Sequence, residues 1–136
     1  MPKDRRLVFS QPMQVRWGDL DAYGHVNNTV YFRFFEEARI QWFSSLRLAA
    51  DGQGEGPVII TAGAVFKQEL TYPAKVTIEV LTGKAGNSSL ETFYRVVDDD
   101  DSTVYAEGDA KVVWISHDNG RPTPLPDSLR DLAAGT

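Results

Sequence analysis

The polar segment of residues 16–32, RWGDLDAYGHVNNTVYF, gathers the side chains best suited to chemistry. Asp19 and Asp21 supply carboxylates, His25 is one of only two histidines, and a pair of asparagines ends at Asn28, just before an aromatic run. If that run is a helix, its first N–H groups carry the positive end of the helix dipole and can polarise a carbonyl oxygen. A carboxylate facing the same volume would act as a base or nucleophile. Acyl transfer needs this pair of groups.

The spacing within this segment allows such a meeting, although it does not require it. Asp21 lies six or seven residues before Asn27 and Asn28, either of which suits a helix N-cap, and Gly24 permits a tight turn between them. In the plainer alternative the aspartates bond nearby turn amides, and His25 is an ordinary hydrogen-bonded loop residue. No regular metal-ligand or triad spacing is present. Composition and spacing alone leave both interpretations open.

Residues 28–46 predict the long helix that would present these groups. At about 100° per residue, one arc of this helix is apolar. The members of this arc are Tyr31, Phe34, Phe35, Ala38, Trp42 and Leu46. Ile40 and Phe43 interrupt the polar side, which indicates a core helix covered on more than one face. Arg39 lies at the edge of the arc, where we expect an ion pair with a helical glutamate.

Strands account for most of the remaining chain. The alternation of apolar and polar residues predicts them at residues 13–17, 58–70, 75–84, 89–98 and 103–116, with a loop at 49–57 and turns at 86–88 and 98–102. Small residues share one face of the last strand, where they would let a helix approach closely. One helix among antiparallel strands indicates a single α+β domain over residues 1–136. Residues 1–11 and 118–136 are expected to be peripheral tails, the second with a short helix at 127–133.

Composition narrows the classes of protein. The net charge of −5 and the pI of about 4.9 argue against a nucleic-acid binder. No apolar run approaches the roughly 20 residues of a membrane span, and the first residues have no apolar signal region. The lack of cysteine excludes disulfides and thiolate zinc sites, which suits a cytoplasmic protein. A single helix covers only one face of a sheet, so we expect an oligomer.

The motif DLDAYGHVNNTVYFRFFEEAR closely resembles the opening motif of hotdog-fold acyl-CoA thioesterases of the 4-hydroxybenzoyl-CoA thioesterase type. The order of the expected elements is also similar to a hotdog domain, a long helix wrapped by a five-stranded antiparallel sheet. The resemblance implies that Asp21 is the catalytic carboxylate and that the backbone amide of Asn28 polarises the thioester carbonyl. It gives His25 a supporting role, because Tyr23 stands where the related plant acyl-carrier-protein thioesterases have an asparagine.

The resemblance also implies an activity, the hydrolysis of an acyl-CoA thioester to a free acid and coenzyme A. Asp21 would act as nucleophile or as general base. The expected substrate-binding residues are Gly24, Val26, Asn27 and Tyr31. No metal or other cofactor is implied, since coenzyme A is part of the substrate. The protein would be a homodimer or homotetramer whose neighbouring subunit completes the pocket.

The sequence also offers candidates for phosphate binding and two alternative functions. Lys67, Lys84 and Arg95 are candidates for binding the coenzyme A phosphates. Another hotdog enzyme, a hydratase or dehydratase acting on an enoyl or hydroxyacyl thioester, would depend on His25 instead. A non-catalytic hotdog module that binds an acyl thioester is the third alternative. Asp19 is expected to orient the turn or Arg16.

Overall fold

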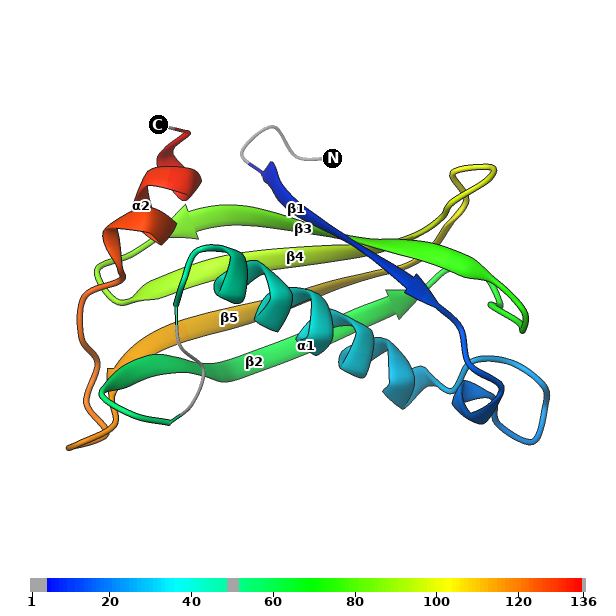
Figure 1. Ribbon diagram of the computed structural model, residues 1–136, viewed down its shortest axis with the longest axis horizontal. Coiled ribbons are helices and arrows are strands. Elements are labelled where there is room, and N and C mark those ends of the chain that lie inside the picture. Colours follow the sequence, from blue (N-terminus) through cyan, green and yellow to red (C-terminus); the bar gives the residue numbers. More distant parts are fainter. Residues whose placement is uncertain (1–4, 49–51, 136) are drawn as a thin grey trace.

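The computed structural model describes residues 5–48 and 52–135, which form a curved antiparallel sheet with a long helix across one face (Figure 1). The order of the strands in the sheet is β1-β3-β4-β5-β2. Their bounds are β1 Arg6–Gln14, β2 Glu55–Phe66, β3 Lys75–Ala85, β4 Ser89–Asp98 and β5 Val104–Ser116. The helices are α1 (Asn28–Ser45) and α2 (Asp127–Ala134), and one 3-10 turn, η1, spans Trp17–Asp19. This is the expected five-stranded hotdog architecture.

Helix α1 buries its aromatic arc against the sheet, as the sequence predicts. Tyr31, Phe34, Phe35, Ala38 and Trp42 are all buried. Phe43 is buried as well, whereas Ile40 on the outer side is 38% exposed. The helix is therefore covered on more than one side near its C-terminal end only.

The close packing of α1 on the sheet depends on Gly108, one of the small residues on the helix-facing side of β5. The ring of Phe35 fills the space above this glycine, and a Cβ atom built there would overlap the ring. The Phe35 ring also stacks on Tyr94 of β4, with 5.0 Å between the ring centroids. The small residues of β5 thus fix the height of the helix above the sheet, as the sequence indicates.

The two ends of the chain are more structured than the sequence suggests. Strand β1 begins at Arg6, not near residue 13, so part of the expected N-terminal tail pairs with β3 at the edge of the sheet. Only an edge strand tolerates Pro12 at such a position. At the other end α2 packs beside β3, and its Leu129 is fully buried in the core. The helix expected at 127–133 is present, but the segment that carries it is part of the packed domain.

Strand β2 also begins earlier than predicted. It starts at Glu55 and contains Pro57, which the sequence places in a loop. Pro57 is tolerated because β2 is the other edge of the sheet, paired only with β5. Residues 49–51 of the expected loop lie outside the described residues. Strand β2 ends at Phe66, so residues 67–70 leave the sheet as a loop instead of continuing the strand.

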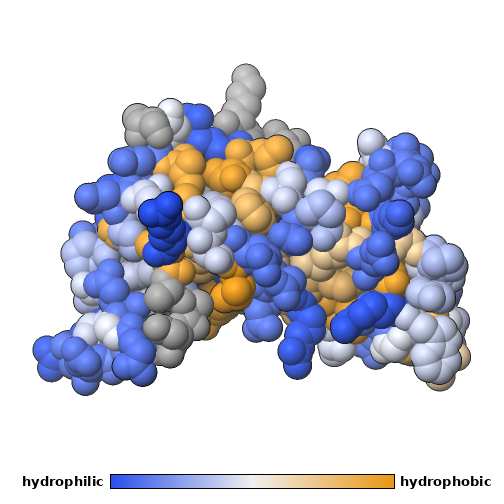
Figure 2. All heavy atoms as spheres, viewed as in Figure 1, coloured by the Kyte–Doolittle hydropathy of each residue, from blue (hydrophilic) through white to orange (hydrophobic). Residues whose placement is uncertain are grey.

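Strand β2 has one edge that no other strand of the described chain pairs. Four of its large apolar side chains are exposed, namely Ile59, Ile60, Val65 and Phe66. On the face that carries α1, apolar surface is visible in several patches between polar side chains (Figure 2). No helix in the described residues is long and apolar enough to cross a membrane.

Candidate active site

The polar segment before α1 folds into a closed turn. Leu20 and Val26 form an isolated antiparallel bridge, the amide of Asp21 donates to the carbonyl of His25 at 2.9 Å, and the amide of Gly24 donates to the carbonyl of Asp21 at 3.0 Å. Gly24 has a φ of +81°, a conformation that L side chains rarely adopt. The turn therefore brings Asp21 back beside the start of α1, as the spacing allows.

Asp19 and Asp21 have different roles in this turn. Asp19 is 4% exposed and accepts from the Arg16 amide at 2.8 Å and from the Arg16 guanidinium at 3.1 Å. It holds the entry of the turn, as expected. Asp21 is only half-buried, and its Oδ1 accepts from the amides of Tyr23 at 2.9 Å and His25 at 3.4 Å. Within the described residues its Oδ2 accepts no hydrogen bond, so this oxygen is left unpaired.

The structure distinguishes the roles of the two asparagines. Asn27 is the N-cap of α1, and its Oδ1 accepts from the backbone amide of Thr29 at 3.0 Å. Asn28 is the first helical residue, and no acceptor in the described residues takes its N–H. A donor left free at a helix N-terminus is suited to bind an anionic oxygen.

Asp21 and Asn28 line the same cavity, which has a volume of about 340 Å³. Its other walls come from the turn, the first turn of α1 and the loop after β2. They are His25, Val26, Tyr31, Phe66, Lys67, Gln68, Glu69 and Leu70. Of the four expected substrate-binding residues, Val26 and Tyr31 line the cavity. The other two do not line it: Gly24 shapes the turn, and Asn27 caps α1. Burial raises the pKa of the Tyr31 phenol, which keeps it neutral.

Glu69, on the far wall, is not marked by any pattern in the sequence. Glu69 lies in the loop after β2, and its Oε2 is 3.1 Å from Nε2 of His25. This loop is held against the turn by the amide of Val26, which donates to the carbonyl of Leu70 at 2.7 Å. No local pattern marks Glu69, because 44 residues separate it from His25 and only the fold brings the two together. His25 therefore pairs with Glu69 through its imidazole and with Asp21 only through its backbone.

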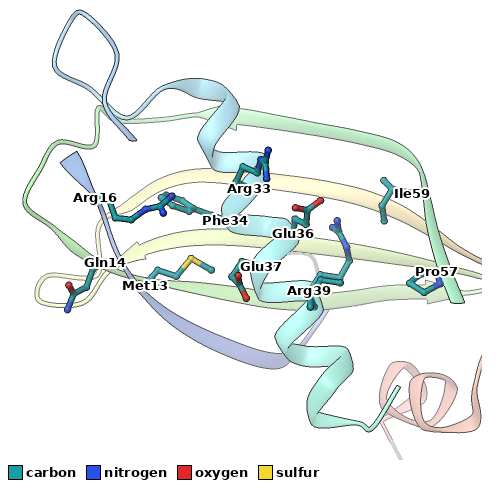
Figure 3. A pocket seen from close by; sticks show the side chains of 11 residues that line it. Met13, Gln14, Arg16, Arg33, Phe34, Glu36, Glu37, Arg39, Pro57 and Ile59 are labelled. Atoms are coloured by element: carbon teal, nitrogen blue, oxygen red, sulfur yellow. The ribbon is translucent and has the colours of Figure 1, made fainter. Parts of the chain in front are cut away.

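A second, larger hollow lies farther along α1 (Figure 3). Its volume is about 620 Å³, and it spans the outer side of α1 between the end of β1 and the start of β2. Charged side chains of both signs line it, including Arg16, Arg33, Glu36, Glu37 and Arg39. It contains neither Asp21 nor the start of α1. Its mixed charge, without a free carboxylate beside a free amide, does not offer the groups that acyl transfer needs.

Arg39 departs from the expected ion pair within the helix. Its Nη1 donates to the hydroxyl of Tyr94 at 3.0 Å, and that hydroxyl is 2.7 Å from Oγ1 of Thr92. Thr92 and Tyr94 are both buried, so Arg39 caps a chain of polar groups in the core. The guanidinium thus adds a charged donor to a hydroxyl that already has Thr92 as a partner.

The three cations proposed for phosphate binding lie in different places. Arg95 forms an ion pair with Glu79, and Lys67 lies 2.6 Å from Glu107. That hydrogen bond from Lys67 lowers the pKa of Glu107. Of the three, only Lys67 borders the cavity that holds Asp21. No three histidine, aspartate or glutamate side chains converge as a metal site in residues 5–48 and 52–135.

Comparisons with known proteins find relatives of this chain in sequence and in fold. The family model of the thioesterase-like superfamily matches residues 15–132. The PA2801 protein of Pseudomonas aeruginosa, a candidate thioesterase, is 41% identical, with a TM-score of 0.90 over 93% of this chain and 98% of that one. A candidate acyl-CoA thioesterase of Xanthomonas campestris is 30% identical, with a TM-score of 0.79 over 88% and 100%. A 1,4-dihydroxy-2-naphthoyl-CoA thioesterase of Synechocystis shares the fold at 18% identity, with a TM-score of 0.84 over 93% and 95%.

Proposed function

The chain belongs to the thioesterase-like superfamily, and from this premise we propose that it hydrolyses an acyl-CoA thioester to the free acid and coenzyme A. The family and its neighbours support a thioester hydrolase at the general level. One observation carries the finer proposal: the free Oδ2 of Asp21 and the free amide of Asn28 border one cavity.

In the proposed reaction the thioester carbonyl lies against the start of α1. The Asn28 amide and the helix dipole stabilise the negative charge that develops on the carbonyl oxygen. In enzymes where such a donor has been removed, its loss costs about 2.7–4 kcal/mol of transition-state stabilisation. The side chain of Asn28 has no part in this step, since the donor is its backbone N–H.

Asp21 supplies the other half of the chemistry. Its carboxylate either attacks the carbonyl carbon to give an acyl-aspartyl anhydride, or takes a proton from the attacking water. The two turn amides on Oδ1 fix the carboxylate plane while leaving Oδ2 for the reaction. No cofactor enters the proposal, because coenzyme A arrives as part of the substrate.

We further propose that the working unit is a homodimer, or a homotetramer built from dimers. Strand β2 offers an unpaired edge with exposed Ile60 and Val65, and two copies can join such edges antiparallel into one continuous sheet. Phe66, at the end of the same strand, lines the candidate cavity and is 45% exposed. A second copy on β2 would therefore cover the open side of the cavity.

Release of free thiol from a panel of acyl-CoAs tests the proposal. The panel spans short, long, branched and aromatic acyl groups, and a chromogenic thiol reagent reports the product. We expect turnover of at least one class by the wild type. If the wild type is inert on the whole panel yet binds acyl-CoAs, it is a non-catalytic hotdog module. Product formed from an enoyl-CoA without thiol release would identify a hydratase.

A further inference from the structure

The imidazole of His25 and the carboxylate of Glu69 meet across the cavity that holds Asp21. Nε2 of His25 is 3.1 Å from Oε2 of Glu69, and both side chains line the cavity wall. His25 is held from behind, since its carbonyl accepts from the Asp21 amide at 2.9 Å. Within the described residues Nδ1 of His25 makes no hydrogen bond. One ring nitrogen is thus fixed by a carboxylate, and the other is free.

The pair is not needed to close the turn. Backbone hydrogen bonds already hold this segment on both sides of His25. The Asp21 amide closes the turn on the His25 carbonyl, and the Val26 amide joins the turn to Leu70 in the loop after β2. The Glu69 side chain is 73% exposed, and exposed ion pairs contribute only about 0–1 kcal/mol to stability. The arrangement instead matches the general pattern of an acid–base histidine, in which a carboxylate sets the orientation of the ring and leaves the other nitrogen to exchange a proton.

We propose that His25, oriented by Glu69, is the general acid that protonates the departing thiolate of coenzyme A. This role rests on the proposed thioesterase activity, and it assigns the leaving-group side of the reaction, which Asp21 and Asn28 do not serve. His25 is then a catalytic residue, and Glu69 is a positioning residue. Imidazole is suited to the task because it exchanges a proton near neutral pH.

The protons balance along either route. His25 enters the step as an imidazolium, with Nε2–H toward Glu69. As the C–S bond breaks, its electron pair goes to sulfur and the Nδ1 proton of the imidazolium goes to the same sulfur, which leaves as a neutral thiol. On the nucleophilic route, water then attacks the anhydride, neutral His25 takes the water proton, and Asp21 is released as a carboxylate. On the general-base route, Asp21 takes the water proton first and passes it to His25 after the thiol leaves.

Other proton donors on the cavity wall are less suited. The ammonium of Lys67 is engaged by Glu107 at 2.6 Å. The phenol of Tyr31 is a weaker acid than usual, because burial raises its pKa. Asp21 is needed as a base or nucleophile at the same moment. His117, the other histidine, lies at the far end of β5, where its amide donates to the carbonyl of Gly54.

Substrates that differ only in the leaving thiol test this proposal. One acyl group is presented as its coenzyme A thioester, its pantetheine thioester and an aryl thioester, whose thiolate leaves without protonation. For His25→Ala we expect kcat/KM to fall by about 10²-fold or more on the two alkyl thioesters and by less than about tenfold on the aryl thioester. Comparing pantetheine with coenzyme A separates leaving-group chemistry from nucleotide binding.

Glu69 supplies the second variant, which keeps the test valid if His25→Ala fails to fold. We expect Glu69→Gln to show the same selective loss at smaller size, about tenfold, and Glu69→Asp to recover part of it. Glu91→Gln on β4 removes one exposed carboxylate elsewhere and should leave all three rates unchanged.

The possible outcomes are distinct. Equal losses of rate on all three thioesters, or no loss on the alkyl ones, would overturn the role of His25. If Asp21→Asn is inactive on all three in that case, the proposed thioesterase function survives without it. A wild type that cleaves none of the three thioesters would overturn both.

Discussion

Two aspartate-rich turns in this chain use the same local hydrogen bonds, yet only one borders a cavity. At the hairpin tip between β4 and β5, Oδ2 of Asp98 accepts from the amides of Asp100 at 2.9 Å and Asp101 at 3.1 Å. Its Oδ1 accepts from the Tyr105 hydroxyl at 2.8 Å. In the turn before α1, Asp21 accepts amides through Oδ1 alone. Both oxygens of Asp98 are therefore occupied, whereas one oxygen of Asp21 is left over.

The comparison shows what separates a structural aspartate from a candidate catalytic one. Both turns satisfy backbone amides with a carboxylate, so local pattern does not distinguish them. The difference lies in the surroundings of each carboxylate. Beside Asp21 there is a cavity and the unpaired amide of Asn28, while the hairpin tip has neither. Sequence composition marks the tip, with four consecutive aspartates, more strongly than the turn before α1.

The largest expected effect comes from exchanging each aspartate for asparagine. Asp21→Asn keeps an acceptor for the turn amides but removes the base or nucleophile, so we expect kcat on the best acyl-CoA to fall by about 10²–10⁴-fold. Asp98→Asn, the matched control, should leave kcat unchanged. Circular dichroism and gel filtration would establish that both variants are folded. Full activity in Asp21→Asn would remove the distinction between the two turns.

The substitution Ile60→Lys tests whether the cavity beside Asp21 depends on a second copy of the chain. Ile60 is 54% exposed on the unpaired edge of β2, so the charge should not disturb the core. Across a dimer interface two like charges would meet. We expect Ile60→Lys to shift the protein toward monomer in sedimentation velocity and to lower specific activity by about tenfold or more. An active monomer would show that one chain holds a complete site.

Removal of the N-cap tests whether the position of the Asn28 amide depends on the Asn27 side chain. Asn27→Ala deletes the acceptor for the Thr29 amide, and such losses cost about 1 kcal/mol of stability. We expect a lower urea midpoint and a reduction of kcat, because the first turn of α1 frays. Asn27→Ser retains a capping oxygen and should restore most of both. If Asn27→Ala lost stability without any loss of kcat, the start of α1 would not be part of the site.

The smallest effect concerns the pH dependence contributed by the hairpin tip. The Tyr105 hydroxyl and two backbone amides hold the pKa of Asp98 below its ordinary value. The folded state thus prefers the carboxylate, which stabilises it above the unfolded pKa of about 3.9 and ceases to do so as the pH falls through the lowered folded value. Between pH 7 and pH 3, the urea midpoint should fall less in Asp98→Asn than in the wild type. An identical fall in both would mean that the bonds at the tip do not stabilise it.

The sequence predicted those elements best whose signals are local. Helix α1 was expected at 28–46 and ends at Ser45, because an asparagine cap and an aromatic arc define it within the segment itself. Strand β4 was predicted at its full length, since turns bound it on both sides. The starts of β1 and β2 were predicted wrongly, because edge strands lack the regular alternation of half-buried ones and tolerate the prolines that elsewhere signal loops.

The candidate site could be proposed from the sequence where its signals are local. Asp21, Gly24 and Asn28 belong to one short segment, so their spacing and motif were enough to propose them. Glu69 was not predicted, because it reaches His25 only through the pairing of the loop after β2 with the turn before α1. The choice between Asn27 and Asn28 as cap likewise needed the backbone geometry.

The position of β2 in the sheet has a consequence for how the chain is made. During synthesis, β2 emerges before β3 and β4, but among the described strands it pairs with β5 alone, which ends at Ser116. Until β5 leaves the ribosome, β2 has both edges unpaired, and the loop that carries Glu69 has no fixed place beside the turn. The candidate site therefore cannot form as soon as the segments that line it have left the ribosome. It forms only when the last strand closes the sheet, and until then an apolar strand is open to wrong partners.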